Sequence, residues 1–181
     1  MVFTEWLRPH QVVMAVVMVA TGGFACSDTP TPTKLLDPAL TEPRFTAAAD
    51  FVSSVVGRGN LGAFSIQSPA HGYGVQLNSH YNTDIVVANI AIAPGGFSGW
   101  HSHPGPVLIT VKTGAITFYE ADDPTCSPVV HEAGTSFIEQ GGTVGQARNE
   151  GTVEATSAVT FFVPAGSPTR IDAAKPDNCE L

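Results

Sequence analysis

The sequence has little positive charge. Its 181 residues include eight lysines and arginines against sixteen aspartates and glutamates, which gives a net charge of −8. The few basic residues form no stripe that could neutralise a phosphate backbone, so we expect no nucleic-acid partner. The acidic balance mainly favours solubility.

The motifs of nucleophilic and nucleotide-dependent enzymes are also missing. The stretch GFSGW, residues 96–100, lacks the spacing of a Gly-x-Ser-x-Gly nucleophile elbow. No glycine-rich stretch has the pattern of a phosphate-binding loop. Cys126 and Cys179 lie in turn-rich, proline-flanked segments that do not indicate a catalytic thiol. We therefore expect neither hydrolysis by an activated serine or cysteine nor nucleotide chemistry.

Long apolar runs are absent, and the longest one lies near the N-terminus. Residues 12–20 are all apolar but make up only about half of the ~20 residues that a membrane-crossing helix needs. An arginine before this run and the small residues Gly23 and Ala25 after it are typical of a secretory signal. We predict a signal peptide over residues 1–25, with a retained anchor helix as the alternative.

The next segment contains Cys26 followed by SDTPTPT, which resembles a bacterial lipoprotein junction. The resemblance implies a lipid on Cys26 and attachment to a membrane, although Gly23 and Phe24 depart from the usual residues before the cysteine. Residues 26–45 are rich in proline and threonine and predict an extended tether. We therefore expect an exported protein, either a membrane-anchored lipoprotein or a freely secreted one.

Three cysteines are an odd number for an exported chain. If Cys26 carries a lipid, Cys126 and Cys179 are left as a pair. A disulfide between them would attach the C-terminal tail, residues 171–181, to the domain, and would stabilise the fold by roughly 4 kcal/mol at most. Two unrelated exposed thiols are the alternative.

Helical heptads and internal repeats are absent as well, whereas short β-type segments recur. Eighteen glycines and fourteen prolines separate runs that are rich in valine, isoleucine, phenylalanine and threonine. Residues 46–59 leave the choice open, because their alanines favour a helix and their FVSSVV favours a strand. The segments that predict strands are AFSIQS, GVQLNS, TDIVVANIAIAP, PVLITVKT, AITFYEA, SPVVHEA, TSFIEQ, GQARNEG and EATSAVTFFVPAG.

These segments predict an all-β, single-domain protein. A closed or double-layered antiparallel barrel hides the edges of a sheet, and we expect residues 84–170 to form one. Residues 46–83 should form strands and a hairpin that pack on the barrel. Residues 84–93 are apolar at nearly every position, which predicts a strand covered on both faces.

The stretch PGGFSGWHSHPGPVLITVKTG has two histidines one residue apart. In an extended strand His101 and His103 project to the same face, which is a common beginning of a metal site. The pattern resembles the first motif of the cupin family, because Gly95, the two histidines and Gly114 match its spacing. Val107 occupies the position of the family's glutamate.

A second stretch, GTSFIEQGGTVGQARN, is similar to the second cupin motif. Gly134, Gly142 and Asn149 fall at its positions, while Gln140 stands in place of a proline and Gly145 in place of the third ligand histidine. The resemblance covers about residues 84 to 166. It implies a jelly-roll β-barrel.

The same resemblance leaves the metal site incomplete. Small exported bacterial cupin-domain proteins of cupin type 2, which the chain resembles more narrowly, usually have histidines at the positions of Thr143 and Gly145. A catalytic zinc or non-heme iron site needs about three protein ligands, and His101 and His103 are two. The family's dioxygenase or isomerase chemistry is therefore not carried over. We expect either weak binding of a divalent metal, with copper or nickel preferred over manganese or iron, or a metal-free polar patch.

A third ligand from outside the motifs would change this prediction. Glu139 is the most interesting candidate because it begins the turn that leads to Gly145, although we expect a glutamate at a strand end to be solvated. The other residues of suitable type are His71, His80, His131, Glu120 and Glu132.

Together these observations predict an exported, non-catalytic cupin-fold protein that binds a small molecule in its barrel. The residues expected to line the pocket beside the two histidines are Trp100, Val107, Ile109, Phe118, Tyr119, Gln146 and Asn149. A metal-dependent enzyme of oxygenase or isomerase type is the first alternative, and it requires an unrecognised third ligand. A module that binds another component of the cell envelope is the second alternative. Pairing of edge strands in a homodimer is a further expectation.

Overall fold

The computed structural model describes residues 45–70 and 72–181. The regular structure of these residues consists of β1 (Ala49–Ala70), β2 (Tyr73–Phe97), β3 (His101–Ser102), β4 (Val107–Thr113), β5 (Ala115–Glu120), β6 (Val129–Glu132), β7 (Ser136–Glu139), β8 (Gly145–Arg148), β9 (Ala155–Pro164) and β10 (Ile171–Asp172). The described residues include no helix that is long and apolar enough to cross a membrane. The predicted signal peptide, the lipidation of Cys26 and the tether up to residue 44 lie outside the described residues.

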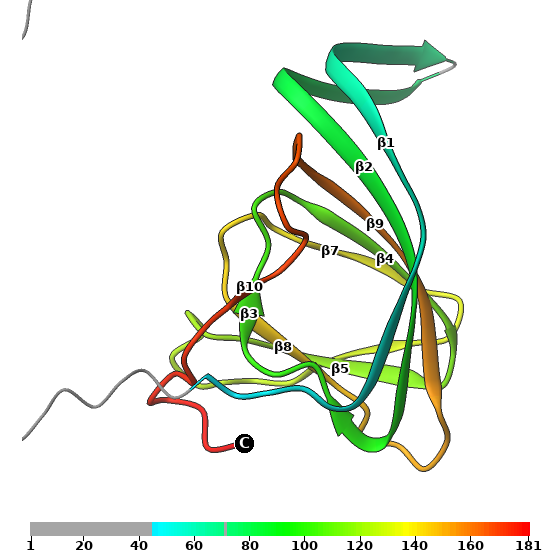
Figure 1. The fold of residues 1–181 in the computed structure, drawn as a ribbon. Coiled ribbons are helices and arrows are strands. Elements are labelled where there is room, and N and C mark those ends of the chain that lie inside the picture. The colour runs from blue at the N-terminus through cyan, green and yellow to red at the C-terminus, as the bar shows by residue number, and fades with distance from the viewer. Residues whose placement is uncertain (1–44, 71) are drawn as a thin grey trace, which may run out of the picture. The chain divides into compact units, whose positions relative to one another are not determined.

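The ten strands form one sheet that curls into a nearly closed barrel, and Figure 1 shows them arranged around a common interior. Hydrogen bonds join the strands in the order β10-β3-β8-β2-β9-β4-β7; β1 is added beside β2, and β5 connects β8 to β6. The pairs are antiparallel. The predicted all-β barrel is confirmed.

An apolar interior holds the barrel together. In β9 every second residue from Ala155 to Val163 is buried, because successive side chains of a strand point to opposite faces. The main core cluster comes from β2, β4 and β9 and consists of Val86, Ala88, Val107, Ile109, Val159, Phe161 and Val163. Burial of one large aliphatic or aromatic side chain contributes about 1.5–3 kcal/mol, so this cluster fixes the register of the three strands.

The first two strands form one long hairpin. Residues 46–59, for which the sequence leaves helix and strand open, lie mostly in β1 and are extended. Their β-branched valines suit a pleated strand, and the segment from Phe51 to Gly59 pairs with β2. The strand interpretation of this segment is therefore correct.

Along the barrel, β2 is covered on one face. Val86 and Ala88 are buried in the interior, whereas Val87 and Asn89 are exposed on the outer face. The prediction that residues 84–93 are covered on both faces is wrong, because no second layer of the described chain packs over Val87 and Asn89.

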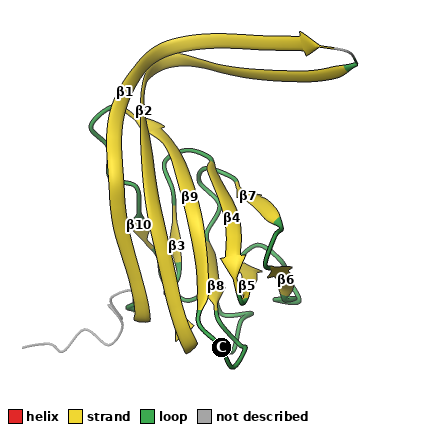
Figure 2. Ribbon diagram, turned by 90° about the vertical axis from the view of Figure 1, so that its right-hand side faces the viewer, coloured by secondary structure: helices red, strands yellow, loops and turns green. Residues whose placement is uncertain are grey.

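The far part of the hairpin extends beyond the barrel (Figure 2). β9 pairs with β2 from Thr83 to Ile92, and the described part of β2 before Thr83 pairs with β1 alone. We call residues 60–70 and 72–82 the arm; His71 lies outside the described residues. The arm is therefore a two-stranded ribbon, whereas residues 83–97 of β2 belong to the barrel.

Asp84 anchors the base of the arm. Its carboxylate accepts hydrogen bonds from the backbone N–H of Gly166, from the Asn60 amide and from the Arg58 guanidinium. These hydrogen bonds lower the pKa of Asp84 to about 2. The aspartate thus joins β1, β2 and the loop after β9.

Cys126 and Cys179 form the predicted disulfide, across a sequence separation of 53 residues. Cys179 is fully buried and packs with Trp100 and Tyr119. The C-terminal segment is also held by β10, which pairs with the histidine-bearing strand β3. The disulfide therefore attaches the segment that lies next to the two histidines.

Removing this disulfide should destabilise the barrel. In the chain-entropy model a bond of this span constrains the unfolded chain, and we expect the C126S/C179S variant to lose about 2–4 kcal/mol of unfolding free energy. Urea denaturation of the oxidised protein, the reduced protein and the double variant measures the difference. The reduced protein should match the variant; equal stability of all three would show that the bond does not stabilise the fold.

Candidate metal centre

Two buried histidines lie at the centre of the site. His101 belongs to β3, where it pairs with Gly145 of β8 and Asp172 of β10. His103 follows directly after the strand, and both side chains face the barrel interior. The two rings are almost perpendicular, with their centroids 4.7 Å apart.

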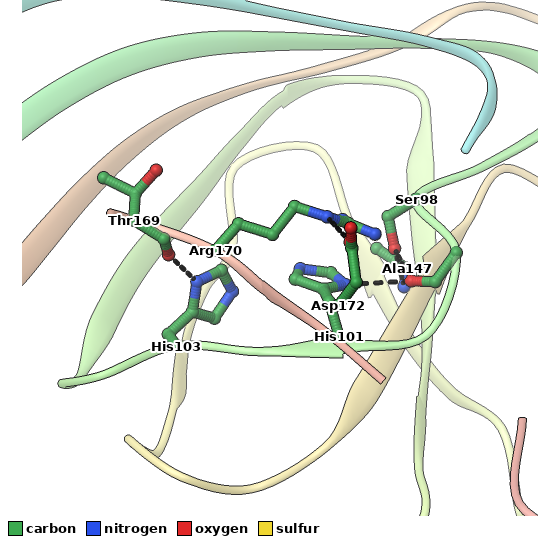
Figure 3. A network of polar contacts seen from close by, with 8 residues as sticks. Ser98, His101, His103, Ala147, Thr169, Arg170 and Asp172 are labelled. Carbon is green, nitrogen blue, oxygen red and sulfur yellow. Dashed lines mark hydrogen bonds and ion pairs between the residues drawn. The ribbon is translucent and has the colours of Figure 1, made fainter. Parts of the chain in front are cut away.

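Backbone carbonyls orient both rings. The Nδ1–H of His101 donates to the carbonyl oxygen of Gly99 at 2.8 Å, and the Nδ1–H of His103 donates to that of Thr169, as Figure 3 shows for His103. A carbonyl can only accept, so Nδ1 carries a proton in both rings. Nε2 of a neutral His101 ring therefore keeps a free lone pair, whereas Nε2 of His103 lies beside the Glu139 carboxylate. Histidines that bind metals are commonly held in this way by a hydrogen bond from their second nitrogen.

Glu139, the last residue of β7, completes a group of three. Its Oε2 lies 3.0 Å from Nε2 of His103, and its side chain is only 14% exposed. The candidate ligand atoms of His101, His103 and Glu139 all lie within 4.8 Å of one another. Two imidazole nitrogens and one carboxylate suit a divalent transition metal, and three protein ligands leave further coordination positions open.

The pairing of β4 with β7 places this carboxylate. Glu139 is the cross-strand partner of Val107, the residue at the position of the cupin glutamate. Residues directly opposite each other in an antiparallel pair point to the same face, with their Cβ atoms about 4.5–5.5 Å apart. The neighbouring strand therefore supplies a carboxylate close to the place from which the motif would supply one.

The turn after Glu139 is fixed to the histidine segment. The Gly142 N–H donates to the carbonyl oxygen of His103 at 2.8 Å. A Cβ atom at Gly141 would lie 2.7 Å from the Cα atom of Gly105, so the two backbones approach too closely for a side chain. The expectation that Glu139 is solvated is wrong, because this contact holds the end of β7 against His103.

Several solved structures are similar to a part of this chain. No protein-family model and no curated protein matches the chain. Similar solved structures include an uncharacterized conserved protein with a double-stranded β-helix domain from Klebsiella pneumoniae, at 23% identity and a TM-score of 0.43 over 50% of this chain and 76% of that one. A cupin-2 domain containing protein from Shewanella frigidimarina is 13% identical, with a TM-score of 0.36 over 42% of this chain and 69% of that one.

An oxalate oxidase is also similar, at 24% identity and a TM-score of 0.38 over 48% of this chain. The match covers 51% of the oxidase, so the chain spans about half the length of that protein. The nearly closed barrel, with its His-x-His segment facing the interior, is the architecture that the sequence resemblance to the cupin family implies.

The barrel has no room for a histidine at position 145. A Cβ atom on Gly145 would overlap the ring of Phe118, which faces it from β5. Phe118 is buried and packs against Phe137, with ring centroids 5.8 Å apart. An aromatic side chain thus fills the space that the family's third histidine would need.

The interior cavity of the barrel is small and mostly apolar, with a volume of about 40 Å³. This volume accommodates about three water molecules. His101, His103 and Glu139 lie in its wall, together with the predicted pocket residues Val107 and Ile109. The hydroxyl of Ser157 also lies in the wall, where it is buried and makes no hydrogen bond.

The other predicted pocket residues do not line this cavity. Trp100 and Tyr119 pack with Cys179 beneath the C-terminal segment, and the Tyr119 hydroxyl donates to Glu150. Asn149 is a structural clamp, since its side chain bonds the backbones of Ile92, Val153 and Gly151. Gln146 is buried opposite Tyr119, and Phe118 fills the space beside Gly145.

The remaining residues of ligand type lie outside the group of three. His131 stacks on Phe137, with ring centroids 3.8 Å apart, and its burial lowers its pKa. His80, Glu120 and Glu132 are exposed. Of the candidate third ligands that the sequence offers, only Glu139 joins the two histidines. Its pairing opposite Val107 is the feature that identifies it.

Burial keeps His101 neutral. Desolvation, and then the electrostatic effects of the neighbouring Arg170 and His103, lower the pKa of His101 to about 4. Arg170 itself is paired with Asp172 at 2.6 Å, beside His101 in Figure 3. At neutral pH the Nε2 atom of His101 is therefore free to bind a metal.

The low pKa of His101 predicts a pH dependence of stability. In the unfolded chain this histidine binds a proton below about 6.5, whereas in the folded chain it does so only below about 4. Stability is therefore lost as the pH falls from 6.5 to 4, by up to about 3 kcal/mol. Without metal, the unfolding free energy of wild type should fall more steeply over this window than that of H101Q. Parallel curves for the two proteins would refute the shifted pKa.

Proposed function

We propose that this protein is an exported metal-binding cupin that holds one divalent transition metal on His101, His103 and Glu139. The observation that carries the proposal is the convergence of one ring nitrogen from each histidine and one carboxylate oxygen within 4.8 Å. The three side chains are buried or nearly so, and their hydrogen bonds to backbone fix the two rings before any metal arrives. A preorganised group of this kind binds more tightly than two histidines alone.

The surroundings support a small ligand on the metal. Three protein ligands leave open coordination positions, and the wall beside them is apolar apart from Ser98 and Ser157. The unpaired Ser157 hydroxyl is a buried polar group that would gain a hydrogen bond from a water molecule or a small polar ligand. The cavity volume of about 40 Å³ limits that ligand to a few non-hydrogen atoms unless the barrel opens.

A metal-dependent enzyme is the second candidate function. The sequence disfavours an enzyme because Val107 and Gly145 stand at the positions of two family ligands. In the structure Glu139 supplies a carboxylate in place of the missing glutamate. When bound in such a site, a metal polarises a bound oxygen or activates water. This chain would contribute the orientation of the ligands and an apolar wall that limits access of bulk water.

Export is part of the proposal. The Cys126–Cys179 disulfide is a bond that persists in oxidising compartments and is uncommon in the cytosol. The predicted signal peptide leads to the same conclusion. In such a location the protein would acquire its metal outside the cytoplasm.

Metal titration of the purified apo protein tests this function. Isothermal titration with Zn²⁺, Ni²⁺, Cu²⁺ and anaerobic Fe²⁺ should show one metal per chain. E139Q should weaken binding by roughly 10- to 100-fold, because the amide keeps the shape of the side chain but loses its charge, and H101A/H103A should abolish binding. E132Q is the matched control, since Glu132 is exposed on β6, and it should bind as wild type does.

A second variant tests the cross-strand argument. V107E/E139V moves the carboxylate to the partner position on β4 and should bind metal better than E139V alone. The proposed function fails if wild type binds no metal, or if E139Q and E132Q bind it equally well.

A further inference from the structure

The arm has one apolar and one polar face. Cross-strand pairs place Phe64 opposite Ser79, Ile66 opposite Leu77 and Ser68 opposite Val75. Because partners share a face and successive residues alternate, the apolar residues lie on one face together with Ser68 and Ser79, and the other face carries polar side chains. The apolar members are Phe64, Ile66, Tyr73, Val75 and Leu77, and the polar face includes Ser65, Gln67, Gln76 and Asn78. Such alternation indicates a ribbon that covers an apolar surface on one side.

Much of that apolar face is exposed. Ile66 is 51% exposed, Tyr73 73% and Leu77 44%. A two-stranded hairpin is marginally stable in water unless one face packs against something. Both edges of the arm are also unpaired within the described chain, since β1 pairs with β2 alone and β9 joins β2 only from Thr83. The arm therefore needs a partner to be stable.

An apolar row on the outer face of the barrel lies beside the arm. Val87, Thr160, Leu108 and Ile138 are consecutive cross-strand partners on β2, β9, β4 and β7. The three apolar members are 37%, 42% and 64% exposed. Side by side they form an apolar band across four strands, with no charged side chain in it.

The arm and this face meet in a groove of about 390 Å³. Phe64, Leu77 and Tyr81 line it from the arm, and Leu108 and Ile138 line it from the barrel, with prolines before β4 and at the end of β9. No Asp, Glu, Lys or Arg lines the groove, and residues 59–83 contain none at all. In Figure 2 the arm bends away from the barrel axis above the strands that carry this face.

We propose that a second copy of this chain seats the apolar face of its arm in this groove, and that the two copies exchange the contact about a two-fold axis. Each chain carries both halves of the contact, an apolar ribbon and an apolar groove, so one symmetric pairing covers both at once. The inference is independent of the metal site.

Charge favours a second copy as the occupant. Two chains of net charge −8 repel each other except through a surface that carries no acidic residue, and the arm and groove are such a surface. The lack of lysine and arginine on the arm removes the attraction to anionic lipid on which surface-bound membrane segments commonly rely.

The size of the surface fits a stable dimer. An arm strand of eleven residues is about 36 Å long, and a two-stranded ribbon is about 10 Å wide. The arm face and the four-strand band together approach the roughly 800 Å² per partner that a standard interface buries.

The test is sedimentation equilibrium of the purified protein at micromolar concentration, with charge introduced separately on each half of the contact. Wild type should be a dimer. I66K on the arm, at a residue that does not line the chain's own groove, and L108E in the groove should each weaken the dimer by roughly 100-fold or more, because every dimer would bury the new charge twice. V153E is the matched control: Val153 is 61% exposed, lies outside the groove, and should leave the dimer intact.

Mixing the two variants gives the decisive result. In an equimolar mixture the Lys-bearing arm of one chain meets the Glu-bearing groove of the other, and the second contact is wild type, so a heterodimer should form. Its formation also shows that both variants are folded. A monomeric wild type, a dimer that survives I66K, or a failure of the folded variants to pair would overturn the proposal, as would a monomer that binds neutral lipid vesicles through the arm.

Discussion

The register between β4 and β7 is the constraint on which the candidate metal site depends. It places Glu139 opposite Val107 and therefore beside His103. A slip of one residue would turn Glu139 to the outer face, because side chains alternate along a strand. The same register puts Ile109 opposite Phe137 in the core, so the packing that stabilises the barrel also positions the carboxylate.

The C-terminal segment provides the second constraint. It is attached through the disulfide and β10, and its Thr169 carbonyl orients the His103 ring. On the opposite side of the ligand segments, Pro106 and Ile138 line the groove in which a second copy would dock. The segments that carry the ligands thus contact the core, the C-terminal segment and the groove. Each of these three contacts can be altered separately by mutation.

Much of the fold follows from local sequence, because alternating apolar residues and turn signals specify strands directly, as in β9. The metal group does not follow in the same way. The His-x-His pair is a local pattern, but Glu139 becomes a ligand candidate only through its pairing with Val107, and register is a non-local property. The sequence predicts that Trp100 and Tyr119 line the pocket, but both pack against Cys179 instead. This contact is also non-local, because Cys179 is far away in the sequence.

The position of a bound metal ion tests the account most directly. Anomalous X-ray diffraction from crystals grown with Zn²⁺ or Ni²⁺ should show one strong peak per chain, about 2.0–2.2 Å from Nε2 of His101, Nε2 of His103 and a carboxylate oxygen of Glu139. A peak bound by the two histidines alone, with Glu139 turned away, or no peak in the barrel interior would contradict the claim that the neighbouring strand completes the site.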